Sequence, residues 1–256
     1  MSTLLATHVS ARFARQGGIY IILLAAILWG TVGVTTRGVF TLSDTTALTV
    51  AFLRLAVALP ALAATALAIL GRRALAVQPR HLLLMGGAGI LLALYQLLYF
   101  GAIQRVGVAV ATLVTLCAAP VIVALISMTL LGERATRQRL LAAGLAIGGT
   151  VLLVNPGEGA VAGNQTVLGI FLALGSATGY ALIAIVSRTL SRVAHPLTSM
   201  TVSFAFGAAA LLPALLLEGV HLSFAPAAWG LILYLGIVPS ALAYVLFTIG
   251  MRTTVA

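Results

Sequence analysis

Charged residues are scarce in this 256-residue chain, at 7% of the sequence against 62% hydrophobic residues. A soluble globular domain carries about a quarter charged residues, so this chain could not cover its own surface in water. A protein in lipid meets the opposite demand, because its exterior is apolar. The composition therefore excludes a soluble domain and predicts an all-α, polytopic transmembrane helix bundle.

Lysine is absent, and the net charge of +10 comes from fourteen arginines that lie between apolar runs. They form no basic patch of the kind that binds nucleic acid. The single cysteine, Cys117, excludes a disulfide framework. The four histidines lack metal-ligand spacing, so we expect no metal site and no cofactor.

A membrane-spanning helix needs about 20 mostly apolar residues. The polar N-terminus, residues 1–17, precedes a first apolar run that lacks a signal-peptide cleavage pattern and is predicted to be retained. Eight spans are predicted in all: residues 18–38, 46–70, 80–101, 106–131, 138–154, 166–187, 197–217 and 226–250.

The arginines are divided unequally between the two sides of these spans. Cytoplasmic loops of membrane proteins carry the excess of basic residues, so we predict a cytoplasmic N-terminus. The arginine-, alanine- and leucine-rich usage indicates a bacterial protein and therefore the inner membrane. Two arginines, Arg37 and Arg105, fall outside, and eleven fall inside: Arg12, Arg15, Arg72, Arg73, Arg80, Arg134, Arg137, Arg139, Arg188, Arg192 and Arg252.

The chain also repeats itself, with the order of the matches preserved over three helices. Trp29 recurs 151 positions later as Tyr180, Leu59-Pro60 recurs as Leu212-Pro213, and Tyr99 recurs as Phe247. The unit therefore begins at the first span and again at the sixth, and its five helices make the second copy enter the membrane from the opposite side. Such inverted repeats are typical of secondary transporters. We predict a complete first repeat at 18–154 and an incomplete second repeat, with three helices, at 166–256.

Spans three to five carry a recognisable pattern: the run Tyr99-Phe-Gly-Ala-Ile-Gln-Arg-Val-Gly-Val-Ala-Val-Ala111, then Pro120, the loop Gly132-Glu133-Arg134, and Gly144 and Gly148. This pattern resembles the EamA-type drug/metabolite transporters, and within them it is most similar to the YddG-type amino-acid exporters. The resemblance implies ten helices, a central cavity that opens to one side at a time, and export of metabolites from the cytoplasm.

Arg54 is the ionisable side chain that lies well inside a span. A charge there costs at least about 2.5 kcal/mol, so it should face the bundle or water. The guanidinium could anchor a substrate carboxylate bidentately, or it could be structural, bonded to backbone carbonyls or snorkelling. No acid lies inside a span, which favours facilitated diffusion over proton coupling.

Aromatic side chains with polar tips lie along several spans. Rings that carry a hydroxyl or an indole donor suit a cavity for a partly apolar solute, although helix packing or interfacial belts would also explain them. The predicted substrate-binding residues are Trp29, Arg54, Tyr95, Tyr99, Tyr180 and Tyr244. The predicted hinges are the helix prolines, which each remove a backbone hydrogen bond: Pro60, Pro120, Pro213 and Pro239.

These features favour an exporter of amino acids, with drugs or other metabolites as alternative substrates and the lipid bilayer as the surrounding partner. A monomer is plausible. An intramembrane enzyme would need a nucleophile beside an embedded base. Serines are present in the spans without a histidine or an acid at matching depth, so no catalytic residue is assigned. A channel is disfavoured because no filter segment or re-entrant loop is visible.

Two five-helix repeats amount to ten spans, of which this sequence holds eight. Ala256 aligns with Val108, at the start of the fourth span, so we expect two further helices in the natural protein. The length of the genomic reading frame checks this expectation. A stop codon directly after Ala256 would contradict it and leave the alternative, a natural eight-span chain.

Overall fold

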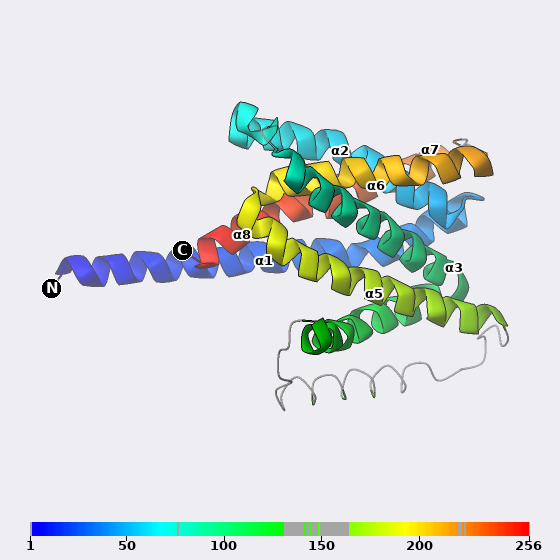
Figure 1. Cartoon of the computed structure of the whole chain (residues 1–256), viewed down its shortest axis with the longest axis horizontal. Helices are drawn as coiled ribbons and strands as arrows, with labels where there is room; N and C mark the ends of the chain where they lie inside the picture. The colour runs from blue at the N-terminus through cyan, green and yellow to red at the C-terminus, as the bar shows by residue number, and fades with distance from the viewer. Residues whose placement is uncertain are drawn as a thin grey trace.

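The computed structural model describes residues 2–75, 77–130, 164–219 and 224–255, with four isolated positions between these ranges (Figure 1). Within the described residues every regular element is a helix, which confirms the all-α class. The elements are α1 (Ser2–Leu42), α2 (Ala47–Leu70), the 3-10 helix η1 (Gly71–Leu75), α3 (Pro79–Leu130), α5 (Asn164–Val193), α6 (Pro196–Glu218), α7 (Pro226–Gly236), the π-helix η2 (Ile237–Leu242) and α8 (Ala243–Val255).

Six helical stretches are long and apolar enough to cross a membrane: Gly17–Leu42, Ala47–Ala74, Pro79–Ile126, Asn164–Val193, Pro196–Glu218 and Pro226–Arg252. The third of these contains the third predicted span and most of the fourth. The Gly132-Glu133-Arg134 loop lies outside the described residues, as does the fifth predicted span, 138–154, apart from three isolated positions. The chain is therefore a multi-pass membrane protein.

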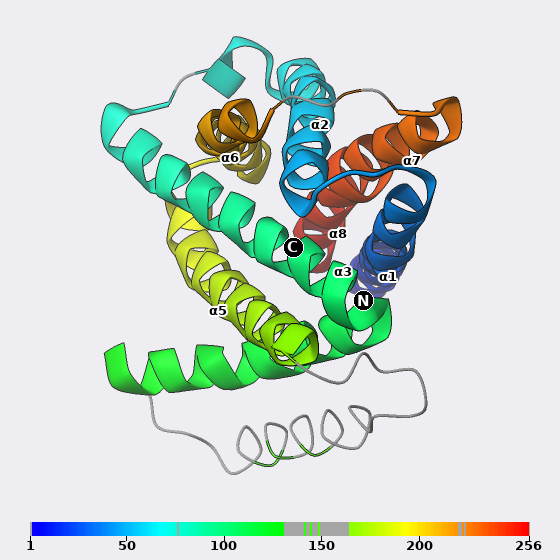
Figure 2. The same ribbon diagram turned by 90° about the vertical axis from the view of Figure 1, so that its right-hand side faces the viewer.

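The predicted break between spans three and four is misplaced. A connection was expected between residues 101 and 106, but α3 stays helical there and departs from helical geometry at Gly107, where φ is 78°. Glycine reaches positive φ without steric cost, so a single residue lets the chain change direction (Figure 2). Gln104 fixes this end of the bundle, because its Nε2 donates a hydrogen bond to the Thr45 carbonyl at 3.2 Å.

The helices of the two predicted repeats run in opposite directions along the bundle (Figure 1). From left to right in that view run α1, the first half of α3, and α6, whereas α2, α5 and the α7–α8 pair run from right to left. Helix–helix contacts also occur in pairs that the predicted repeat relates to each other. The α3–α5 contact has a counterpart in α8–α1, α3–α6 has a counterpart in α7–α2, and α2 packs directly on α6.

Arginines separate between the two ends of this bundle. One end holds η1, the start of α3, the α5–α6 connection and the end of α8 (Figure 1), and these segments carry Arg72, Arg73, Arg80, Arg188, Arg192 and Arg252. The opposite end holds the last turns of α1 and the Gly107 break in α3, near which lie Arg37 and Arg105.

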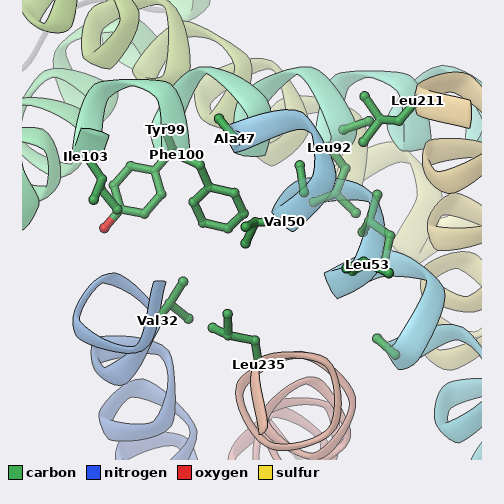
Figure 3. Close-up of a cluster of buried hydrophobic side chains, with 14 of the residues drawn as sticks. Val32, Ala47, Val50, Leu53, Leu92, Tyr99, Phe100, Ile103, Leu211 and Leu235 are labelled. Carbon is green, nitrogen blue, oxygen red and sulfur yellow. The ribbon is translucent and has the colours of Figure 1, made fainter. Parts of the chain in front are cut away.

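The main hydrophobic cluster lies where α1, α2, α3, α6 and α7 meet (Figure 3). Phe100 points from α3 toward Val50 of α2 with the Tyr99 ring beside it, while Leu235 of α7 points toward Val32 of α1 (Figure 3). Phe100 and Leu235 are completely buried. This arrangement places the inner faces of both repeats around one centre.

The four predicted hinge prolines lie in two kinds of environment. Pro60, Pro120 and Pro213 lie inside α-helices, with exposed side chains. Pro239 is buried and belongs to the π-helical segment η2. Whether any of them acts as a hinge stays a prediction, but Pro239 is the one at an irregular turn inside the bundle.

Glycines allow α3 and α6 to approach to backbone contact. A Cβ atom placed on Gly89 would overlap the Ser203 carbonyl, and one on Gly207 would lie 2.8 Å from the Gly89 carbonyl oxygen. Ser203 reinforces this crossing by donating a hydrogen bond from its hydroxyl to the Met85 carbonyl at 3.0 Å. Small residues are the usual means by which membrane helices come this close.

This contact gives a stability test with a control on the same helix. Gly89→Ala should destabilise the protein by about 1–3 kcal/mol, the usual effect of forcing a methyl group into a packed contact. Gly87→Ala should be neutral or slightly stabilising, because a Cβ there would meet nothing within 4 Å and alanine favours helix over glycine. Melting temperatures of both variants in one detergent check this, and equal values would contradict the assigned packing.

Candidate substrate site

Arg54 lies on α2 and is 5% exposed. Its Nε donates a hydrogen bond to Ser240 Oγ at 2.8 Å, and Ser240 Oγ in turn donates to the Leu235 carbonyl at 2.7 Å. The guanidinium carbon lies 5.9 Å from the centroid of the Phe100 ring. A buried arginine thus reaches from the first repeat to η2 in the second.

The rest of this guanidinium is not fully satisfied. Nη1 of Arg54 is buried and has no hydrogen-bond partner among the described residues. A buried donor to which nothing is bonded costs free energy, and more so when it is charged. The arrangement therefore leaves Arg54 with hydrogen-bonding capacity for an additional acceptor.

Two aromatic pairs join helices of different repeats, and the repeat relates them to each other. Trp29 of α1 lies edge to face with Tyr244 of α8, their centroids 5.2 Å apart, and 5.3 Å from Phe247. Tyr180, the repeat equivalent of Trp29, lies on α5 with its ring centroid 5.7 Å from Tyr95 of α3. Each repeat therefore directs an aromatic side chain of its first span onto the third span of the other repeat.

The remaining predicted tyrosine joins the same group. Tyr99 stacks on Tyr95 with centroids 6.4 Å apart, and its hydroxyl forms a hydrogen bond with Thr112 Oγ1 at 2.7 Å. Tyr99 also packs against Phe100, whose ring lies over the Arg54 guanidinium. The structure thus joins Tyr95, Tyr99 and Tyr180 to Arg54 through Phe100, and it pairs Trp29 with Tyr244, which lies one helical turn after Ser240.

Two further polar atoms in this region lack a protein partner among the described residues. They are Nε1 of Trp29, a donor, and Oε1 of Gln96, an acceptor on a side chain that is 1% exposed. Gln96 lies one helical turn before Phe100 on α3, so the two side chains share a face. Unpaired donors and an unpaired acceptor near one aromatic group suit a ligand with both kinds of polar group.

Several residues of this group were not assigned from the sequence. Ser240, Phe100 and Thr112 contact predicted residues directly, and Phe204 lies edge to face with Tyr244 at 5.8 Å. Serine, threonine and phenylalanine are common in any apolar helix, so composition could not single them out. Pro239, the residue before Ser240, was predicted from the sequence only as a hinge in the helix.

Comparison with known proteins gives this group a family context. The sequence profile of the EamA-like transporter family matches residues 16–155 and, a second time, residues 167–256. The chain belongs to the EamA-like transporter family. Its arginine-centred aromatic group is therefore the candidate substrate site of a transporter.

Two individual relatives are also named transporters, and one solved structure shares the fold. An "Uncharacterized transporter" of Archaeoglobus fulgidus is 34% identical over 231 residues, covering 90% of this chain and 76% of the relative. The "Uncharacterized transporter YwfM" of Bacillus subtilis is 29% identical over 240 residues, covering 92% of this chain and 78% of the relative. A solved structure described only as "Crystal structure of protein" has a TM-score of 0.68 and 25% identity, covering 93% of this chain and 80% of its own.

Oε1 of Gln96, which has no partner among the described residues, allows a test of whether the polar side chains of this site stabilise the fold. Gln96→Leu should raise the melting temperature, because a buried acceptor without a partner is destabilising by about 1–3 kcal/mol. Thr115→Val should lower it, since the Thr115 hydroxyl donates to the Ala173 carbonyl at 3.2 Å across α3 and α5. Thermal melting of both purified variants checks this. A lower melting temperature for Gln96→Leu would show that the amide has a structural role.

Proposed function

We propose that this chain is a secondary transporter that exports small metabolites, in particular neutral or aromatic amino acids, across a bacterial inner membrane by alternating access. The observation that carries the proposal is the buried Arg54 guanidinium, which faces the aromatic group with Nη1 unpaired among the described residues. An uncompensated charge in a membrane-embedded bundle is a functional-site hypothesis by default.

The polar and apolar parts of the site favour a carboxylate on an apolar side chain. Arginine pairs with carboxylates through two parallel hydrogen bonds, and no Asp or Glu of this sequence lies in the interior of a predicted span to occupy it. The ring of Phe100 lies 5.9 Å from the guanidinium carbon, and Tyr99 packs against Phe100. These rings, together with those of Tyr95, Tyr180, Trp29 and Tyr244, suit an apolar or aromatic substrate side chain. A neutral amino acid combines the two features.

The arrangement of the helices supports alternating access. Corresponding helices of the two repeats run in opposite directions, and the contacts within each pair are matched by their counterparts (Figure 1). The family profile also matches the chain twice. We interpret these features as an inverted pair of repeats whose relative movement exposes the site alternately to the two sides.

The arginine-rich end of the bundle is assigned to the cytoplasm, following the bias of basic residues toward that side. This assignment places the N-terminus in the cytoplasm. Because the acidic residues Asp44, Glu133, Glu158 and Glu218 all lie outside the predicted spans, we propose movement down the substrate gradient without a proton-binding carboxylate. Uptake that is insensitive to a protonophore is the expected behaviour.

Transport into proteoliposomes tests the role of Arg54. The wild type should take up radiolabelled L-phenylalanine and should discriminate against L-phenylalaninamide, which lacks the carboxylate. Arg54→Ala should lower L-phenylalanine uptake at least about 30-fold, as expected for removing one partner of a buried charge pair. Its melting temperature should stay near the wild-type value.

Arg105→Ala is the matched control, because Arg105 is a second arginine that is only partly satisfied: its Nη1 donates to the Gly101 carbonyl of its own helix at 3.0 Å, and its Nε, like Nη1 of Arg54, is buried without a hydrogen-bond partner among the described residues. The Arg105→Ala variant should keep the wild-type preference for L-phenylalanine over L-phenylalaninamide. Equal uptake of the acid and the amide, together with normal uptake by Arg54→Ala, would contradict a carboxylate anchor. That result would favour apolar drugs as substrates. Loss of folded Arg54→Ala protein would instead identify a structural arginine.

A further inference from the structure

Arg54 is held in place by a side chain from the other repeat. Its Nε carries a single hydrogen, and that hydrogen is donated to Ser240 Oγ at 2.8 Å. The side edge of the guanidinium, made of Nε and one Nη, is therefore already engaged. A ligand carboxylate must approach the opposite end, where Nη1 is unpaired among the described residues.

The orientation of Ser240 follows from the proline before it. In an α-helix the N–H of residue 239 would bond to the carbonyl of Leu235, but Pro239 has no N–H to donate. The Ser240 hydroxyl donates to that same carbonyl at 2.7 Å. Its only hydrogen is thereby committed to the backbone, so its lone pairs are left to accept from Arg54.

The irregular backbone of η2 belongs to this arrangement. Residues 237–242 form a π-helix, and the N–H of Ala243 bonds to the Val238 carbonyl, five residues earlier. π-helical turns inside α-helices occur frequently at functional sites. Here the turn holds the buried side chains of Pro239 and Ser240 opposite Arg54.

Comparison with the equivalent crossing in the other repeat strengthens this interpretation. The match of Leu59-Pro60 with Leu212-Pro213 aligns Arg54 with Gly207. Gly207 contacts the backbone of Gly89, and neither residue carries a side chain. A charged side chain therefore lies at this position in one of the two related crossings, whereas the other is joined by backbone contact and by the hydrogen bond from Ser203 to the Met85 carbonyl.

We infer that Ser240 is a positioning residue of the transporter: it fixes Arg54 through Nε so that Nη1 and Nη2 are presented end-on to the carboxylate of the substrate. The inference rests on the proposed role of Arg54. It adds that the geometry of the anchor depends on a hydroxyl group from the second repeat. Because Arg54 and Ser240 belong to different repeats, the orientation of the anchor depends on how the repeats are placed.

The first measurement does not depend on transport. In protein labelled with ¹⁵N-arginine, the Nε–H resonance of Arg54 is assigned by its disappearance in Arg54→Lys. It should exchange slowly with solvent in the wild type and in Ser240→Thr, which keeps the hydroxyl. In Ser240→Ala the resonance should shift and exchange faster. An unchanged resonance in Ser240→Ala would overturn the inference.

The second measurement is L-phenylalanine uptake into proteoliposomes. Ser240→Ala should raise KM about tenfold, comparable to losing one hydrogen bond to a charged group, with the maximal rate within about twofold. Ser240→Thr should restore KM. Ser203→Ala removes the buried hydroxyl at the α3–α6 crossing and should lower the amount of folded protein without changing KM.

The two measurements distinguish failure of the positioning role of Ser240 from failure of the anchoring role of Arg54. A normal KM for Ser240→Ala in a protein whose Arg54→Ala variant is inactive would overturn the positioning role and leave the anchor intact. Absence of L-phenylalanine uptake by the wild type would count against the proposed substrate. The Nε–H resonance would then still decide whether Ser240 orients Arg54.

Discussion

A buried guanidinium in an otherwise apolar bundle is the constraint on which the centre of this protein depends. Water cannot satisfy polar groups there, so each must find a partner within the chain or in a ligand. Arg54 finds one partner in Ser240 and keeps Nη1 unpaired among the described residues. Ser240 is available because Pro239 leaves the Leu235 carbonyl for its hydroxyl. One missing backbone N–H in η2 thus determines how a charge on the neighbouring helix α2 is held.

The two repeats use related helix crossings for different purposes. At the α3–α6 crossing, Gly89 and Gly207 bring two backbones into contact, and the Ser203 hydroxyl bonds across it. At the α2–η2 crossing, the position aligned with Gly207 is Arg54. A contact made by backbone atoms tolerates little rearrangement, because packed cores are not continuously deformable. A contact made by side chains can re-form in a second geometry, so we expect movement to concentrate at the α2–η2 crossing.

Hydropathy predicted the helices because a spanning segment must be apolar along its whole length, which leaves a long and unambiguous signal. The six candidate site residues could be proposed by type, since arginine and polar-tipped aromatics are costly or unusual inside a span, and their role in binding stays a prediction. Gly107 and Ser240 were not. A glycine between Val106 and Val108 looks like part of any apolar run, and a serine shows its role only when its partners are known. A sequence pattern reveals residues whose burial in a span costs free energy, whereas the roles of Gly107 and Ser240 depend on neighbours that are distant in the sequence.

The structure also changes the meaning of the proline pattern. Four prolines are equivalent in sequence as sites of missing hydrogen bonds, yet Pro60, Pro120 and Pro213 have exposed side chains and Pro239 is buried. A proline on the outer face can only bend its helix, whereas at Pro239 the freed carbonyl is taken by a side chain that also binds Arg54. Any movement of η2 against α2 must therefore change either the Ser240–Leu235 or the Arg54–Ser240 hydrogen bond. Because the substrate carboxylate is proposed to bind the opposite end of the same guanidinium, such a movement would also re-orient the anchor, and this would link substrate binding to the relative position of the two repeats in the proposed alternating access.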